Sequence, residues 1–305
     1  MDLRQLETLI AVEENRTFSA AARAMHTVQS NVSSHVARLE RELGVTLVDR
    51  PAQRLTAAGD VVVGRARRVL AELAALAVDV ASLTGEVSGE VALGSIGTTA
   101  RWMVPGLLEE TARRHPGVRV IVSESVTTSL VPQLLTGQLD MAVLNLPLRD
   151  PELSVRPLFD EELVLVAPFG HPLADADEPV SLVELARHEL LLAAPGTTMR
   201  SDLDEAAAQA GVELRARAEV DGVRLAASLA FTGFAATIVP ATAVPTWVQI
   251  PTWRTRTIVE SPRRSVGLAT SRRALPSAPA MATAEVLEEV VRDTGGPLAG
   301  IHLAE

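Results

Sequence analysis

Residues 28–44, VQSNVSSHVARLERELG, contain the pattern that decides how the N-terminal part of the chain folds. Apolar residues recur there at steps of four, four, three and four, at Val28, Val32, Val36, Leu39 and Leu43. At 3.6 residues per turn they form one stripe of a helix, which we expect to face a core. Gly44 is expected to end the helix, because glycine readily adopts the left-handed conformation of a C-cap.

The opposite face of this helix carries short polar side chains and almost no acid. It comprises Ser30, Ser34, Ala37 and Arg41, flanked by Asn31, Ser33 and Arg38. Short hydroxyl and amide groups let a helix enter the major groove of DNA, where glutamine and asparagine can pair with adenine and serine can bond base edges or phosphate. The alternative is an ordinary solvated face, although such faces favour Glu, Lys and Gln over a Ser-Asn-Ser-Ser cluster. On this pattern alone both interpretations stand.

Two shorter helices are predicted before this one. Asp2 and Gln5 resemble a capping box that begins a helix running to about Asn15. Thr17 or Ser19 can cap a second helix, whose small alanine face permits close packing.

Two short strands are predicted after Gly44, at Val45–Val48 and Arg54–Thr56. Arg50 and Arg54 flank the tip between them. Arginines on a hairpin beside a DNA-reading helix suit contacts with phosphate or with the minor groove. Taken without the neighbouring helix, plain exposure to solvent explains them equally well.

A long helix is predicted from Thr56, its cap, to about Leu83. Its apolar residues alternate steps of four and three, at Val62, Ala66, Val69, Leu73, Leu76, Val80 and Leu83. Three heptads of this kind predict a seam against another helix, and the same helix of a second subunit is the obvious partner. Packing on the chain's own body is the alternative. A dimer would place two recognition helices about 34 Å apart, one turn of DNA.

Composition excludes several classes of chemistry. The chain has 305 residues, no cysteine and 28 basic residues, all of them arginine. Disulfides, thiolate metal sites, a P-loop lysine and Schiff-base catalysis are therefore excluded. Residues 1–68 hold ten arginines against eight acids, whereas the rest hold 18 against 30. The net charges of +2 and −12 make the N-terminal segment the only candidate for contact with a polyanion.

Acidic residues within the first twenty argue against a secretory signal, so we expect a cytoplasmic protein. The uncharged stretch Leu225–Trp253 is long enough to span a bilayer. It contains Pro240, Pro245 and Pro251, and it therefore fits a buried helix, a turn and a buried strand better than a membrane segment. We expect no contact with membranes.

The rest of the chain alternates apolar runs with helical patterns. Buried strands are predicted at Val91–Ile96, Arg119–Val122, Leu139–Leu144, Leu163–Ala167, Leu190–Ala193, Ala216–Val220, Ala235–Val239 and Ser265–Thr270. Helices are predicted at 99–114, 129–137, 198–210, 223–232 and 279–293. This alternation predicts an α/β fold with parallel strands and crossover helices, in one sheet or two.

Hydroxyl groups cluster where three of these strands end and helices begin. The candidate effector-binding residues are Ser95, Thr98, Thr99, Thr127, Thr128, Asn145, Thr197, Thr198 and Arg200. Ligands of open α/β sheets bind beyond the carboxyl ends of strands, and helix N-termini attract anions. We therefore expect a small-molecule effector, with a carboxylate favoured. Each threonine alone could be an N-cap, and Arg200 could instead pair with a neighbouring acid.

The chain resembles the LysR-type transcriptional regulators. The resemblance lies in the motifs Asp2–Leu6, Thr17–Ala22, Gln29–Ser33, Leu39–Val45 and Leu55–Gly59 of the N-terminal part, and in Arg101–Pro105 and His115–Val118 of the body. It implies a winged helix-turn-helix over 1–58, a dimerisation helix over 59–87 and an effector-binding domain over 88–305. It also implies two lobes like those of periplasmic binding proteins, lobe I at 88–163 and 266–305 and lobe II at 164–265. The crossing strands would be Leu165–Leu173 and Ser265–Thr270.

The resemblance implies binding to double-stranded DNA. The candidate contacts are Thr17, Ser19, Gln29, Ser30, Asn31, Ser33, Ser34, Arg38, Arg50 and Arg54. Val28 and Ser34 depart from the family, which usually has serine before the glutamine and often arginine after Ser33. The wing is also about two residues shorter than is common. The expected assembly is a homodimer, with a further step to a tetramer and a contact with RNA polymerase left open.

Two other functions compete with gene regulation. For an enzyme, no pair of histidines has the i, i+4 spacing of a helical metal site, and no nucleophile motif occurs, so we expect no catalysis, cofactor or metal. The second is a bilobed small-molecule binding module without a DNA role, which the body alone would resemble. The serine-rich helix and the wing distinguish a regulator from such a module.

Overall fold

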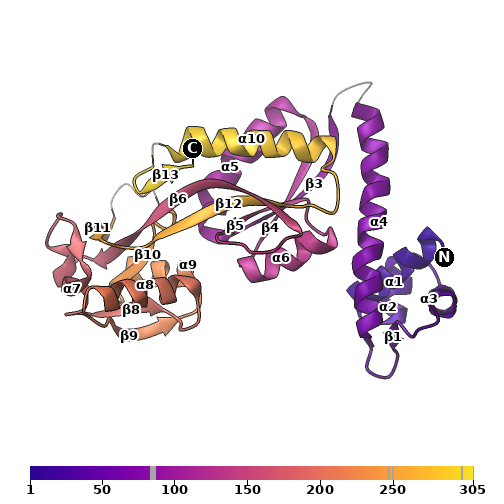
Figure 1. Ribbon diagram of the computed structural model, residues 1–305, viewed down its shortest axis with the longest axis horizontal. Helices are drawn as coiled ribbons and strands as arrows, with labels where there is room; N and C mark the ends of the chain where they lie inside the picture. The colour runs from indigo at the N-terminus through magenta and orange to yellow at the C-terminus, as the bar shows by residue number, and fades with distance from the viewer. Residues whose placement is uncertain (83–86, 246–247, 249–250, 297, 305) are drawn as a thin grey trace.

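The computed structural model describes residues 1–82, 87–245, 248, 251–296 and 298–304 (Figure 1). Residues 1–56 form a small helical head, and residues 87–304 form a larger α/β body. Between them stands the long helix α4 (Ala57–Ser82). Figure 1 shows the head at one end of α4, with α3 on the side away from the body.

The head contains three helices and a hairpin. They are α1 (Leu3–Asn15), α2 (Phe18–Ala24), α3 (Gln29–Leu43), β1 (Val48–Asp49) and β2 (Arg54–Leu55). The capping box predicted at the start of α1 is present, because the Asp2 side chain accepts from the Gln5 amide and the Gln5 side chain accepts from the Asp2 amide. Thr17, rather than Ser19, caps α2.

The middle of the α3 stripe forms the core of the head. Val32, Val36 and Leu39 are buried against α1 and α2. Val28 and Leu43, which we also expected to face the core, are 59% and 40% exposed. That expectation was wrong at both ends, because Val28 is the N-cap residue and Leu43 the last residue of the helix, beyond the turns that pack on α1 and α2.

The first turns of α4 belong to the head. The Thr56 hydroxyl accepts from the Gly59 amide at 3.0 Å, the cap that the sequence predicts. A side chain at position 59 would place its Cβ 2.1 Å from the Leu47 carbonyl oxygen, so only glycine allows this approach. Val63 and Ala66 lie in the core of the head. The boundary expected after residue 58 therefore falls inside α4.

Lobe I of the body is a sheet with helices on both faces. Its strands are β3 (Ser88–Ser95), β4 (Gly117–Glu124), β5 (Met141–Asn145), β12 (Arg263–Ser271), β13 (Ile301–Leu303) and the first part of β6 (Leu153–Pro168). Helices α5 (Gly97–Arg114) and α10 (Ala278–Gly295) pack on one core, while α6 (Thr127–Thr136) packs on the other.

Lobe II is built on the remainder of β6. Its strands are β7 (Val180–Ser181), β8 (Glu189–Ala193), β9 (Arg215–Val220), β10 (Thr237–Pro240) and β11 (Trp253–Val259). Its helices are α7 (Leu182–Leu185), α8 (Thr198–Gln209) and α9 (Val223–Phe231), with short 3₁₀ turns η1 (Pro172–Ala174) and η2 (Ala241–Ala243). The uncharged stretch starting at Leu225 thus lies in α9, β10 and η2, and no described helix is long and apolar enough to cross a membrane.

Strand β6 joins the two lobes. The strand order β4-β3-β5-β12-β6-β10-β8-β9 runs through both, and Figure 1 shows β6 and β12 side by side between them. Strands β3, β4 and β5 are parallel, as are β8, β9 and β10, but β6 is antiparallel to β10, β11 and β12. The sheet is therefore mixed rather than parallel. The crossing expected at Leu165–Leu173 is instead the longer β6, which ends at Pro168.

Candidate DNA interface and effector cleft

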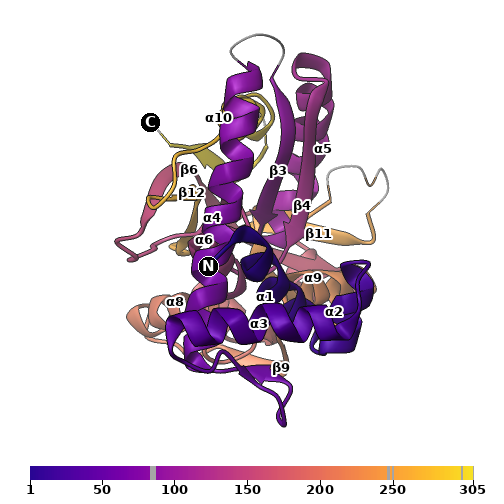
Figure 2. The ribbon, with the colours of Figure 1, turned by 90° about the vertical axis from the view of Figure 1, so that its right-hand side faces the viewer.

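The N-terminal half of α3 presents its polar face to solvent. Gln29, Ser30, Asn31, Ser34 and Arg38 are exposed. Figure 2 shows α3 lying across the end of the molecule, with the β1–β2 hairpin projecting beside it. An exposed helix with short polar side chains next to a projecting hairpin is the geometry of a winged helix that enters a major groove.

Local hydrogen bonds orient the amide side chains of this face. Ser19 Oγ donates to Gln29 Oε1 at 3.1 Å, and Asn31 Nδ2 donates to Thr27 Oγ1 at 3.0 Å. Val28 provides no side-chain cap for α3. Thr17 Oγ1 accepts from the Ala20 amide at 3.1 Å, so this hydroxyl completes the start of α2.

The two wing arginines have different surroundings. Arg50 Nη1 donates to Ser33 Oγ at 3.0 Å, and its guanidinium lies 5.0 Å from the centre of the Phe18 ring. Arg50 therefore lies back against the first turns of α3, and it holds the half-buried Ser33 side chain. Arg54 is exposed at the start of β2.

The apolar stripe of α4 divides into two parts. Val62 and Ala66 pack in the core of the head, so these two residues of the predicted seam contact their own chain. Val69, Leu73, Leu76 and Val80 are between 44% and 63% exposed. Leu83 lies outside the described residues.

The opposite side of α4 contacts lobe I. Asp79 Oδ1 accepts from the Ala278 amide at the start of α10, at 2.9 Å. Ala71 and Ala75 line a cavity against lobe I, and Leu73 lies two residues from each, about 200° around the helix. Contact with the chain's own body therefore leaves the exposed stripe open.

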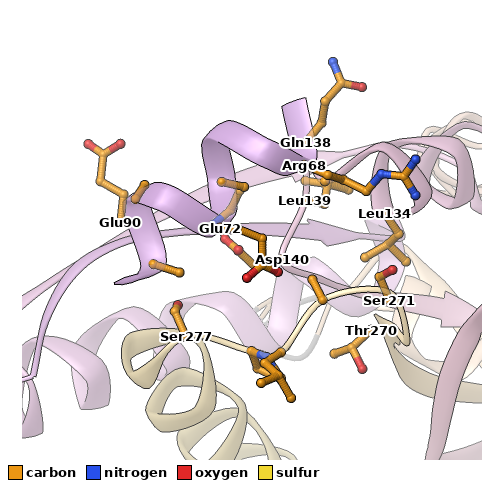
Figure 3. Close-up of a pocket in the computed structure, with 18 of the residues that line it drawn as sticks. Arg68, Glu72, Glu90, Leu134, Gln138, Leu139, Asp140, Thr270, Ser271 and Ser277 are labelled. Carbon is orange, nitrogen blue, oxygen red and sulfur yellow. Dashed lines mark hydrogen bonds between the residues drawn. The ribbon is translucent and has the colours of Figure 1, made fainter. Parts of the chain in front are cut away.

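The cavity between α4 and lobe I measures about 410 Å³ (Figure 3). Arg68 and Glu72 of α4 line one side, and Leu134 and Asp140 of lobe I line the other. Arg68 Nη1 is buried and has no hydrogen-bond partner among the described residues. Burial, together with nearby positive charges of two other arginines, lowers the pKa of the Arg68 guanidinium. The junction between α4 and the body is thus incompletely packed.

The predicted effector residues of lobe I meet at one edge of its sheet. Ser95 pairs in register with Glu124 on β4 and Val143 on β5, so the carboxyl ends of three parallel strands coincide. Thr127 Oγ1 accepts from the Asn145 amide at 3.1 Å, which joins the start of α6 to the end of β5. The carboxyl-end rule therefore located these residues together.

Several of these side chains are already engaged or covered. Ser95 is fully buried, and its hydroxyl donates to the Ile96 carbonyl oxygen. Thr98 accepts a hydrogen bond from Arg264 at 2.7 Å. Thr99 is fully buried, and its hydroxyl finds no partner in the part of the chain that the structure describes. Thr128 is exposed beside them.

In lobe II Arg200 is paired with neighbouring acids, one of the two alternatives that the sequence leaves open for it. Arg200 Nη1 donates to Glu219 at 2.7 Å and to the Ala193 carbonyl oxygen at 2.8 Å, and its Nε lies 2.9 Å from Asp204. The two neighbouring acids therefore balance the charge of this arginine. Thr197 caps α8, whereas Thr198 is exposed.

The sequence analysis missed a buried network at the crossing strands. Glu161 on β6 is fully buried and accepts from Arg264 Nε at 2.6 Å and from the Thr242 hydroxyl at 2.8 Å. Because Arg264 also reaches Thr98, this network joins both lobes beside the crossing strands. Glu161 stands between Asp160 and Glu162 in the sequence, and the local pattern does not distinguish the buried member of these three acids from the other two.

A second missed contact joins the lobes through Glu124 and Arg224. Glu124 ends β4, where the carboxyl-end rule applies, but it lies outside the clusters of hydroxyl groups on which the prediction was based.

Comparison with known proteins gives two family matches. Residues 3–60 match the model for the bacterial regulatory helix-turn-helix protein, lysR family, and residues 84–292 match the LysR substrate binding domain. A "Probable hydrogen peroxide-inducible genes activator" of Streptomyces viridosporus is 34% identical over 302 residues, covering 95% of both chains.

Two solved structures share the whole architecture. A full-length OxyR variant from Pseudomonas aeruginosa has a TM-score of 0.74 at 25% identity, covering 96% of this chain and 95% of the other. Full-length CbnR, a LysR family regulator, in complex with its target DNA, has a TM-score of 0.69 at 26% identity, covering 96% and 100%. A binding module without a DNA-reading head does not fit these matches.

Proposed function

The chain belongs to the LysR family of DNA-binding transcriptional regulators, and on that premise we propose how its own residues read DNA, assemble and respond to an effector. We propose that Gln29, Ser30, Asn31, Ser34 and Arg38 enter the major groove. The observation that carries this proposal is the exposed, acid-free start of α3 beside the wing. Arg54 reaches phosphate, while Arg50 positions Ser33.

The assembly that we propose is a homodimer through the exposed stripe of α4. Four apolar side chains on one face of a helix are costly to leave in water, and a second copy of the same helix would bury them. The stripe points away from the chain's own lobe I, so one subunit can use both sides of α4 at once. Pairing into a tetramer is a separate step, as is a contact with RNA polymerase.

We propose that a small molecule binds between the two lobes, at the carboxyl ends of β3, β4 and β5. A change in the angle between lobes would move lobe I against α4, where the cavity beside Arg68 leaves room for adjustment. The head of each subunit would then change its position on DNA. This role is regulatory rather than catalytic, and it belongs in the cytoplasm with the promoter DNA.

We do not propose a response to hydrogen peroxide, which appears in the name of the Streptomyces relative, for this protein. Reversible peroxide sensing by proteins commonly proceeds through a cysteine thiolate, and this chain contains no cysteine. We therefore propose recognition of a bound effector instead of oxidation of a thiol.

The base-reading role of α3 is tested by Gln29→Ala. Loss of a good bidentate contact costs about 1–3 kcal/mol at the base concerned. We expect weaker binding to the operator and an unchanged affinity for random DNA, measured by fluorescence anisotropy at several salt concentrations. Arg54→Ala, the matched phosphate variant, should weaken both and reduce the salt slope by about one. Equal losses on both DNAs for Gln29→Ala would remove the base-reading role.

A further inference from the structure

The ion pair between Glu124 and Arg224 spans the two lobes. Glu124 is the last residue of β4 in lobe I, and Arg224 is the second residue of α9 in lobe II. Arg224 Nη2 lies 2.7 Å from Glu124 Oε1, and Arg224 Nη1 lies 3.0 Å from Glu124 Oε2. Two parallel bonds of this kind fix the orientation of both groups. The pair therefore sets one particular distance between the lobes.

The pair lies directly over the first residue of α5. A Cβ built on Gly97 would be 2.6 Å from Glu124 Oε1 and 3.2 Å from Arg224 Nε. The missing side chain is what allows both charged groups to approach the helix. The free N–H groups of a first helical turn carry partial positive charge, which favours a carboxylate at this point. Glu124 thus holds the position that the sequence predicts for the effector's anionic group.

We propose that Arg224 is the residue that binds the anionic group of the effector, and that Glu124 holds this place in the free protein and latches the lobes together. The inference rests on the proposed effector role of the region between the lobes at the carboxyl ends of β3, β4 and β5. Arg200, the cation expected from the sequence, is neutralised by Glu219 and Asp204, whereas Arg224 is bound to a single carboxylate that a ligand can replace.

The Glu124–Arg224 pair, which we call the latch, is weak enough for a ligand to displace Glu124 from Arg224. The side chains of Arg224 and Glu124 are 54% and 36% exposed, and ion pairs this open to water are weak. The Glu161–Arg264 network, by contrast, is buried and holds the lobes beside the crossing strands. The buried Glu161–Arg264 network thus acts as a hinge, and the exposed Glu124–Arg224 pair holds the lobes in one position. A small carboxylate that binds Arg224 in place of Glu124 can release this position.

The latch is tested in the full chain by the distance between two spin labels. Because the chain has no cysteine, Glu109→Cys on α5 and Gln209→Cys on α8 introduce two labelling sites per subunit, one exposed position in each lobe, and dilution with excess unlabelled protein isolates the distance within one subunit. Glu124→Gln and Arg224→Gln should each shift the interspin distances measured by electron paramagnetic resonance to longer, broader values. Exchanging the charges, Glu124→Arg with Arg224→Glu, should restore them.

The control is Arg119→Gln, which removes an exposed ion pair with Glu90 inside lobe I and should change nothing. Unchanged distances in both latch variants, or an equal change in the control, would overturn the latch.

The anion is tested with acetate and succinate against chloride at matched ionic strength. Either carboxylate should shift the wild-type distances toward those of Glu124→Gln and should leave Arg224→Gln unaffected. If both carboxylates act like chloride, Arg224 is not the partner of an anionic effector. Binding of the unlabelled wild-type protein to operator DNA in chloride, measured in parallel, tests the DNA-binding role without any carboxylate or latch substitution, so failure of that role is recognised separately.

Discussion

Replacing Leu73 and Leu76 together with glutamate is expected to make the protein monomeric and to lower its affinity for a two-half-site operator by about 100- to 10,000-fold. Both leucines lie on the exposed stripe of α4, at 44% and 63% exposure. A dimer built on this stripe would bury both positions of both subunits, and four buried carboxylates would have no partner. Sedimentation velocity measures the change of mass directly.

The expected loss of affinity for the operator arises because the two heads are no longer joined, and no contact with a base is lost. When one head of a dimer binds, the second is held near its half-site at an effective concentration in the millimolar range. A monomer loses this advantage but keeps its head intact, since Val63 and Ala66 still pack in the head core. Affinity for a single half-site should therefore stay at the wild-type value.

Val61→Glu is the matched control for assembly. Val61 is 64% exposed on the same helix but lies off the stripe, so the variant should sediment as the wild type does. A Leu73→Glu, Leu76→Glu protein that remains dimeric would place the interface on another surface.

Local patterns predicted the helices of the head and their caps, whereas the strand expected at Val45–Val48 is only Val48–Asp49. The spacing along α3, the Asp2–Gln5 box and the Thr56 cap each depend on residues within one or two turns, and each is present. The burial of Ala66 was not predicted, because a heptad pattern does not distinguish a partner in the same chain from one in another subunit.

The pairing of strands from distant parts of the chain could not be predicted from local patterns. Only Leu163–Ala167 of β6 was expected, because Arg156 and Pro157 interrupt the apolar pattern of its first half. The structure places Pro157 opposite Gly267 at a shift in register, where a strand tolerates a residue without an N–H group. The partner that makes this strand is more than 100 residues away.

The predicted effector residues show the same limit for side chains. The carboxyl-end rule brought Ser95, Thr127 and Asn145 to one edge, because it depends only on chain direction. It could not show that Arg200 pairs with Glu219 or that Arg224 meets Glu124, since both pairings depend on how separate elements pack. The sequence therefore predicted which residues meet at this edge of the sheet but not the ion pairs formed near it.

Replacing Glu161 with alanine is expected to lower the free energy of unfolding of the body by about 3–5 kcal/mol. Glu161 is fully buried, and its partner Arg264 is only 13% exposed. Removing the carboxylate leaves a guanidinium in the interior without its counter-charge, and the Thr242 hydroxyl and amide also lose an acceptor. Urea unfolding of the full chain, followed by tryptophan fluorescence, measures the change in midpoint.

The Glu161–Arg264 ion pair as a whole need not stabilise the protein, even though removal of one partner destabilises it. Burying two charges costs about as much as their attraction returns, so Glu161→Leu combined with Arg264→Met should recover most of the stability lost in the single variant. The double variant also removes the hydrogen bond to Thr98, the link between this network and lobe I. It should therefore fold like the wild type yet lose the fixed joint, giving interlobe distances broader than those of the wild type. A double variant as unstable as Glu161→Ala would instead mean that hydrogen bonding, and not the unpaired charge, dominates at this position.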